Sequence, residues 1–154
     1  MRKILLSFSA NVFDSVISGE KIYEHRNVFP DDRVEAYLYL GAPYKCICGI
    51  MHLNKRIDMK EWLDKYRDDK AAVSRIQKYL EKQKYAMEIT DFQMTNRIPL
   101  EKLRKELDRF VVPQMYYYLE DTELLNYLKS NLTKEGKIIK HDFSHIESSQ
   151  ICIR

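Results

Sequence analysis

The sequence lacks any long run of hydrophobic residues. Its apolar stretches fall far short of the roughly 20 residues that a membrane span needs, and the run Ile4–Leu6 is soon interrupted by Ser7 and Ser9. Internal repeats and low-complexity tracts are also lacking. We therefore expect no transmembrane helix, no signal peptide and no contact with a membrane.

Cysteine and net charge are scarce as well. The three cysteines form an odd set, and Cys46 and Cys48 lie two apart in an expected strand, so their side chains share a face without the geometry of a disulfide. Reduced thiols in the cytoplasm fit this pattern best. The net charge of +3 permits RNA binding but does not argue for it, because dedicated nucleic-acid domains usually carry clustered Lys and Arg.

What the chain does contain is material for one packed core. Of its 154 residues, 45% are hydrophobic and 12% aromatic, which favours one globular domain over a disordered chain.

The first part of the chain alternates between strand and helix patterns. Ser9 is placed to cap a helix whose apolar stripe ends before Gly19, and glycine is a common helix stop. Gly41-Ala42-Pro43 marks a turn between two strands. Strands are predicted on both sides of these signals, over residues 3–8, 21–26, 34–40 and 45–53.

The second part begins with helices that we interpret as an insertion between strands. Asp58 and Glu61 resemble a capping box for the first of them. The strand pattern that follows, over 85–96, switches parity, which predicts a bulge near Thr90 and Asp91.

Two more helices are predicted near the end of this pattern, one starting at Pro99 and one capped by Asp121. Residues 133–154 show little periodicity, so we expect a C-terminal extension there that adds an edge strand or is partly mobile.

The segment Gly19–Arg26 combines charge and shape in an unusual order. Gly19 lets the chain turn sharply, and Glu24 and Arg26 share one face of an ideal strand, with Lys21 at the strand entrance leaning toward them. The arginine offers a fork for phosphate or a carbonyl, the glutamate accepts a base N–H, and the lysine supplies a compact cation. A plainer interpretation is a surface ion pair with a solvated lysine nearby.

These residues carry a resemblance to the ASCH domain of the PUA-like superfamily. The order strand, helix, then G-x-K-x-x-E-x-R is met in full by Gly19, Lys21, Glu24 and Arg26. Pro113–Tyr118 is similar to a P-Q-S-x-x-Y segment of related members, although Met115 replaces a small residue.

The resemblance spans residues 1–132 and implies an α+β fold. That fold is a PUA-like mixed β-barrel of about five or six strands with surrounding helices. It also implies a cleft lined by Gly19, Lys21, Glu24 and Arg26, to which we add Gln114 and Tyr116 as binding residues. The role usually assigned to the family is RNA binding, so the expected partner is RNA or a nucleotide-like small molecule.

Catalytic alternatives stay open. A similar branch of the superfamily hydrolyses N4-acetylcytidine with a lysine, a threonine three residues later and a distant glutamate. In this chain Lys21 matches the lysine, but Glu24 replaces the threonine. Glu88 is one candidate for the distant carboxylate. Glu24 is expected to favour the charged form of Lys21, which weakens this reading. Nuclease activity has also been attributed to family members. A regulatory domain that senses a ligand or contacts a protein through the helical insertion is the remaining alternative.

No cofactor and no metal site are expected. His141 and His145 have the spacing of H-E-x-x-H, but that motif needs a helix and a third ligand. Cys46, Cys48 and His52 lack recognised ligand spacing, so the cysteines are interpreted as buried apolar residues.

Overall fold

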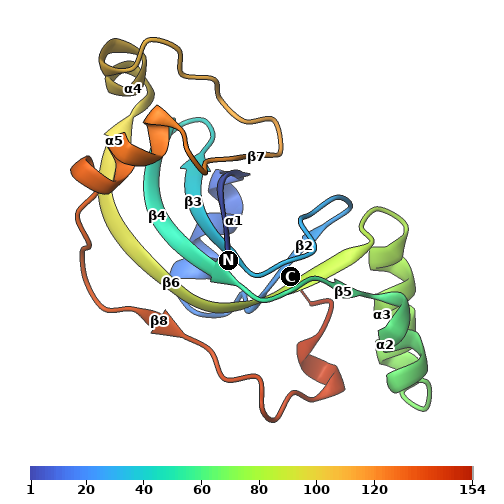
Figure 1. Ribbon diagram of the computed structural model, residues 1–154. Helices are drawn as coiled ribbons and strands as arrows, with labels where there is room; N and C mark the ends of the chain where they lie inside the picture. The colour runs from blue at the N-terminus through green and yellow to red at the C-terminus, as the bar shows by residue number, and fades with distance from the viewer. Residues whose placement is uncertain (154) are drawn as a thin grey trace.

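The chain folds into one strongly curled sheet with helices around it (Figure 1). The computed structural model describes residues 1–153. The strands are β1 (Arg2–Phe8), β2 (Tyr23–Arg26), β3 (Val34–Leu40), β4 (Cys46–Leu53), β5 (Ile57–Asp58), β6 (Tyr85–Pro99), β7 (Tyr116–Tyr118) and β8 (Ile139–Lys140). Their order is β2-β6-β4-β3-β1-β7, and β5 and β8 both pair with β6.

The sheet is mixed, because β1 and β3 run parallel while the other paired strands run antiparallel. It curls into a half-barrel, which confirms the expected α+β class. The described part of the chain has eight strands rather than five or six, since β5 and β8 are two-residue additions along β6.

β6 is the longest strand and contains the predicted bulge. Ile89 pairs with Leu53 and Asp91 pairs with His52, so Thr90 is the extra residue. Because one inserted residue reverses the side-chain alternation, Ile89 and Phe92 can both face the core although they are three apart. The prediction of a bulge near Thr90 and Asp91 is confirmed.

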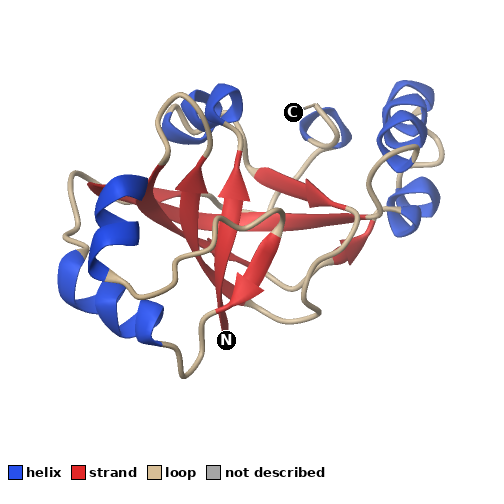
Figure 2. Ribbon diagram, turned by 90° about the horizontal axis from the view of Figure 1, so that it is seen from above, coloured by secondary structure: helices blue, strands red, loops and turns tan. Residues whose placement is uncertain are grey.

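The concave face of the sheet holds the main core. Helix α1 (Ala10–Ile17) places Phe13 edge-on against Phe92, with ring centroids 5.8 Å apart. Helices α4 (Leu100–Glu106) and α5 (Glu123–Asn131) contribute Leu103, Leu125 and Leu128 to a second cluster. Figure 2 shows α4 and α5 at the opposite end of the molecule from the inserted helices.

The insertion consists of α2 (Lys60–Lys65) and α3 (Lys70–Leu80), between β5 and β6. Trp62 of α2 and Ile76 of α3 are buried in a third cluster together with Tyr23 of β2. None of the helices within residues 1–153 combines the length and the apolar character that crossing a membrane requires.

Two predicted helix caps are wrong. α2 begins at Lys60 after Met59, and Asp58 accepts the Lys60 N–H from outside the helix at 3.0 Å. α5 is capped by Thr122, whose hydroxyl accepts the Leu125 N–H at 3.1 Å. Asp121 has φ = +61°, whereas an N-cap residue is normally extended.

The segment after α5 returns along β6 and then crosses to the insertion (Figure 1). Its short 3-10 helix η1 covers Ser148–Gln150, and Ile151 and Cys152 are 0% and 2% exposed in the third cluster. The Arg75 guanidinium of α3 donates to the Ser148 and Ile151 carbonyls at 2.8 and 3.4 Å. This C-terminal segment is thereby attached to α3.

Candidate ligand-binding site

The turn from α1 into β2 positions the charged residues singled out in the sequence. Gly19 has φ = +81°, a left-handed conformation that glycine adopts without a Cβ penalty. Just after it, the Lys21 N–H donates to the Ser15 carbonyl at 2.9 Å, which fixes the start of the segment against α1. Lys21 lies outside β2, as expected for a residue at the strand entrance, and Glu24 and Arg26 lie within the strand.

Lys21, Glu24 and Arg26 form one cluster centred on the carboxylate. Lys21 Nζ lies 3.8 Å from Glu24 Oε1, and Arg26 Nη2 lies 3.5 Å from Glu24 Oε2. Glu24 Oε1 also accepts the His25 N–H at 2.9 Å, and Arg26 Nη2 donates to the Ser7 carbonyl at 2.8 Å. Glu24 is therefore held by two cations and one backbone amide.

Two residues of this cluster are buried, and the Arg26 side chain is partly exposed. Lys21 is 4% exposed and Glu24 6% exposed. The interpretation as a surface ion pair with a solvated lysine is wrong, because the Lys21 and Glu24 side chains are almost inaccessible to solvent. Buried charges are normally paired, and here each of the two has a partner of opposite sign.

Burial also changes the protonation chemistry of Lys21. It lowers the pKa of the ammonium; Glu24 raises that pKa again by a smaller amount, and Arg26 lowers it further. Glu24 acts in the expected direction, but desolvation of a nearly inaccessible ammonium outweighs one carboxylate at 3.8 Å, so the pKa of Lys21 is lowered overall.

A cleft of about 860 Å³ opens beside the cluster. One side of it comes from β1, α1 and β2, and the other from α3, the loop after α3 and the C-terminal segment. Its lining residues are Phe8, Ser9, Val12, Lys21, Glu24, His25, Arg26, Arg75, Lys78, Tyr79, Glu81, Lys82, Gln83, Cys152 and Ile153.

Two of the predicted binding residues lie elsewhere. Gln114 is exposed in the loop before β7, and Tyr116 pairs with Leu6 in the sheet and packs against Phe29, with ring centroids 5.7 Å apart. Neither lines the cleft, and Gly19 shapes the turn without lining it. The structure thus brings together Lys21, Glu24 and Arg26, while Gln114 and Tyr116 belong to another part of the surface.

The far wall of the cleft was missed by sequence reasoning. Arg75 and Lys78 belong to no motif in the sequence, yet both line the cleft. The edge-on contact between His25 and Tyr79, with ring centroids 4.8 Å apart, joins β2 to α3 at this point. Only the packing of α3 against β2 could reveal this, since the two are about 50 positions apart in the sequence.

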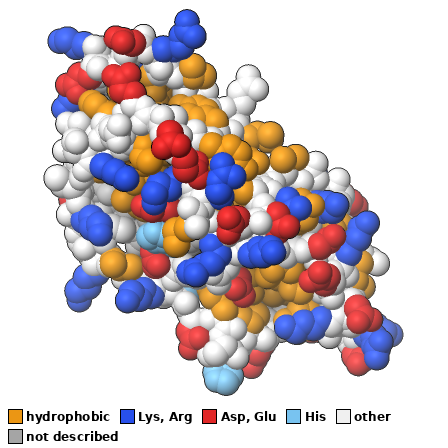
Figure 3. All heavy atoms as spheres, viewed as in Figure 1, with side chains coloured by type: hydrophobic (Ala, Val, Ile, Leu, Met, Phe, Trp, Pro, Cys, Tyr) orange, Lys and Arg blue, Asp and Glu red, His pale blue; other side chains and the backbone are white. Residues whose placement is uncertain are grey.

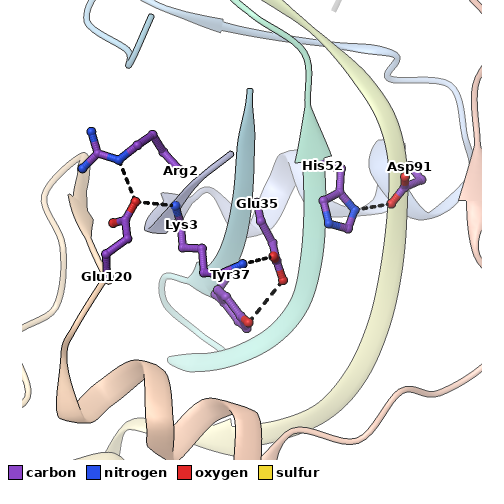
Figure 4. Close-up of polar contacts among 7 residues, drawn as sticks. All are labelled: Arg2, Lys3, Glu35, Tyr37, His52, Asp91 and Glu120. Carbon is purple, nitrogen blue, oxygen red and sulfur yellow. Dashed lines mark hydrogen bonds and ion pairs between the residues drawn. The ribbon is translucent and has the colours of Figure 1, made fainter. Parts of the chain in front are cut away.

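A second polar group crosses the outer face of the sheet (Figure 4). Lys3 pairs with Glu35 at 2.6 Å, the Tyr37 hydroxyl donates to Glu35 at 3.2 Å, and His52 Nδ1 lies 2.6 Å from Asp91 Oδ1. Lys3, Glu35, His52 and Asp91 are direct cross-strand neighbours on β1, β3, β4 and β6. These contacts stabilise the pairing of four strands.

The wider surface carries charges of both signs. Figure 3 shows Lys and Arg interspersed with Asp and Glu over the face seen in Figure 1. Among residues 1–153 no group of three or more His, Cys, Asp and Glu side chains is arranged to hold a metal ion. Cys46, Cys48 and Cys152 are all free and buried.

Comparison with known proteins defines the fold. No family model matches the sequence, and a search of curated proteins finds no match either. The structure of ASCH from Zymomonas mobilis superposes with a TM-score of 0.65 at 22% identity, covering 86% of this chain and 96% of that one.

Two variants of the same Zymomonas mobilis protein agree with this result. A serine-to-alanine variant gives a TM-score of 0.65 at 22% identity, and a tyrosine-to-phenylalanine variant gives 0.63 at 20%; both cover 86% of this chain, and 97% and 100% of theirs. The chain therefore has the fold of ASCH from Zymomonas mobilis, and the resemblance to ASCH is confirmed at the level of the fold.

Proposed function

We propose that this protein binds RNA or a nucleotide-like ligand in the cleft beside Lys21, Glu24 and Arg26. The observation that carries the proposal is a cluster of two cations and one carboxylate, with Lys21 and Glu24 buried, in the wall of a cleft of about 860 Å³. Small-molecule sites usually occupy about 300–1,000 Å³ and combine apolar walls with a few placed polar groups.

The cluster suits a nucleotide chemically. Glu24 is an acceptor that can receive base N–H groups, while the Arg26 guanidinium donates to carbonyl or phosphate oxygens. Val12, Phe8 and Tyr79 add apolar and aromatic surface to the same cleft, against which a planar base can pack. The free thiols of Cys46, Cys48 and Cys152 agree with a reducing, cytoplasmic setting for this function.

The test is a binding titration at low salt with the double variant Lys21→Ala, Arg26→Ala. We expect at least a tenfold loss of affinity for a short single-stranded RNA or for nucleotides, since each charged hydrogen bond contributes about 1.5–3 kcal/mol. The matched control is Lys65→Ala, Arg67→Ala, which removes the same charges from the end of α2 and the turn after it, outside the cleft. Equal affinities of wild type and the cluster variant, with both folded by circular dichroism, would refute the proposal.

Hydrolysis of acylated cytidine is the second candidate, and the lowered pKa of Lys21 favours it, because a lysine base or nucleophile must lose its proton. The position of Glu88, the candidate for the distant carboxylate, argues against this activity. Glu88 pairs with Tyr23 on the opposite face of β2 from Glu24, accepts from the Asn54 amide at 2.9 Å and does not line the cleft. Deacetylation of N4-acetylcytidine by wild type but not by Lys21→Ala would establish the enzyme; no product over hours at high protein concentration would remove it.

The remaining alternative, a regulatory domain that contacts a protein partner, predicts no response to nucleotides. Thermal-shift screening against nucleosides and nucleotides separates it from ligand binding, because a ligand that binds only the folded state raises the melting temperature.

A further inference from the structure

We infer that the ligand carries a phosphate group, and that Lys78 and Lys82 on the α3 side of the cleft bind it. This inference rests on the proposed function and extends it from a nucleotide-like ligand to a phosphorylated one. It also gives the helical insertion a direct part in recognition.

The two sides of the cleft differ in how their charges are balanced. On the β2 side, Glu24 lies within 4 Å of both Lys21 and Arg26, so the carboxylate offsets one of the two cations. On the α3 side, Arg75, Lys78 and Lys82 line the cleft together with one acidic residue, Glu81. The second side therefore has the larger excess of positive charge.

The ion pairs within the protein also favour the α3 side as the phosphate site. Within residues 1–153, Lys78 and Lys82 form no ion pair with an acidic side chain. Both are exposed, so a bound phosphate can reach them without first being fully desolvated. By contrast, a phosphate placed at the β2 side would approach the buried Glu24 carboxylate and be repelled by it.

The α3 side is also held in place. His25 and Tyr79 pack edge-on at 4.8 Å, which joins α3 to β2 one residue after Lys78. Arg75 donates to the Ser148 and Ile151 carbonyls, and Ser148 Oγ donates to Asp69 Oδ2 at 2.5 Å. Arg75 thus holds the C-terminal segment through hydrogen bonds, whereas Lys78 and Lys82 remain available to contact a ligand.

These positions assign an orientation to the ligand. Its planar part lies toward Glu24 and Arg26 in the buried end of the cleft, and its phosphate lies toward Lys78 and Lys82 at the exposed end. The shared chemistry is a phosphomonoester on a nucleoside, whether the nucleotide is free or stands at the end of an RNA.

The test compares ligands with and without the phosphate. Wild type is titrated at low salt with the four ribonucleosides and with their 5′-monophosphates, and the ratio of the two dissociation constants is measured for each base. Two exposed lysine–phosphate contacts are expected to make the monophosphate about tenfold tighter for the preferred base. Lys78→Ala, Lys82→Ala should bring this ratio close to one and leave nucleoside affinity unchanged.

The control is Lys102→Ala, Lys105→Ala on α4, two exposed lysines outside the cleft, which should keep the wild-type ratio. The inference would be overturned if nucleoside and monophosphate had equal dissociation constants in wild type, or if the Lys78→Ala, Lys82→Ala variant kept the wild-type ratio. In either case nucleoside binding, and with it the proposed function, would be unaffected. Loss of binding to nucleosides and nucleotides alike would overturn both. The last comparison distinguishes an RNA end from a free nucleotide as the ligand. A 5′-phosphorylated RNA is titrated beside its 5′-hydroxyl form and beside the free monophosphate. Only a site for RNA ends binds the phosphorylated oligomer at least as tightly as the monophosphate.

Discussion

Lys21 is the residue whose chemistry the fold alters most. On the strand entrance of an extended chain it would be an ordinary solvated lysine, but packing leaves it 4% exposed and lowers the pKa of its ammonium. Glu24 and Arg26 were correctly predicted to share its surroundings, because alternation along β2 places both on one face. The burial of Lys21 and Glu24 was not predictable, since burial depends on packing between parts of the chain that are distant in sequence.

The lowered pKa predicts how Lys21 affects stability as the pH rises. The unfolded chain, with a pKa near 10.5, holds this proton more tightly than the folded chain. Unfolding therefore takes up a proton between the two pKa values, and stability rises with pH across that window. We expect the unfolding free energy of wild type, relative to Lys21→Met, to increase toward pH 10.5 and then to level off.

This is measured by urea denaturation of both proteins between about pH 8 and 11, a range that brackets lysine titration. The difference between the two proteins isolates Lys21, because the tyrosines and other lysines titrate in both. A difference that stays constant over this range would mean that Lys21 titrates as a solvated group.

At the scale of elements, β4 and β6 show how closely two strands and a helix are fitted together. Gly49 of β4 faces Phe92 of β6, and a Cβ built at Gly49 would lie 2.5 Å from the Phe92 ring. Phe92 is 0% exposed and is itself held against Phe13 of α1.

Gly49→Ala is expected to destabilise the fold by about 1–3 kcal/mol, because overpacking forces the ring or the strand to move. Gly41→Ala is the control: a Cβ there meets no atom within 4 Å, so we expect a change of under about 1 kcal/mol. Thermal and urea unfolding measure both. In the Gly49→Ala, Phe92→Leu double variant part of the loss should be recovered relative to the sum of the single changes; strict additivity would contradict the contact.

At the scale of the whole molecule, the C-terminal segment joins parts that are far apart in sequence. Ile151 is 0% exposed in a cluster with Met59, Trp62 and Ile76, whereas Ile153, two residues on, is 51% exposed. No periodic pattern marks this segment in the sequence, because a segment that packs through single residues rather than a regular face has none.

Ile151→Ala is expected to cost about 2–5 kcal/mol of unfolding free energy, the usual range for truncating a buried isoleucine. Ile153→Ala, an equal truncation at an exposed site, should change stability by less than about 0.5 kcal/mol. Urea unfolding curves of the two variants provide the comparison. Equal effects would show that the segment is not packed against α2 and α3.

The order of elements was readable in the chain because it depends on local signals. Alternation predicted β3 over the residues it occupies, the parity switch predicted the Thr90 bulge, and Gly19 predicted the end of α1. The caps at Asp58 and Asp121 were misassigned. α2 begins after Met59, which makes no side-chain cap hydrogen bond, and beside Asp121 it is Thr122, another suitable cap residue, that has the extended backbone.

What the sequence by itself determined, then, is the main strands and the charged trio Lys21, Glu24 and Arg26 around β2, which follow from spacing along the chain, and the α+β class, which the resemblance to ASCH implied. The tertiary structure alone decided that Lys21 and Glu24 are buried, that Gln114 and Tyr116 lie outside the cleft, and that Lys78 and Lys82 line it. The physical reason is that a cleft is formed by surfaces distant in sequence, and burial depends on which surfaces meet.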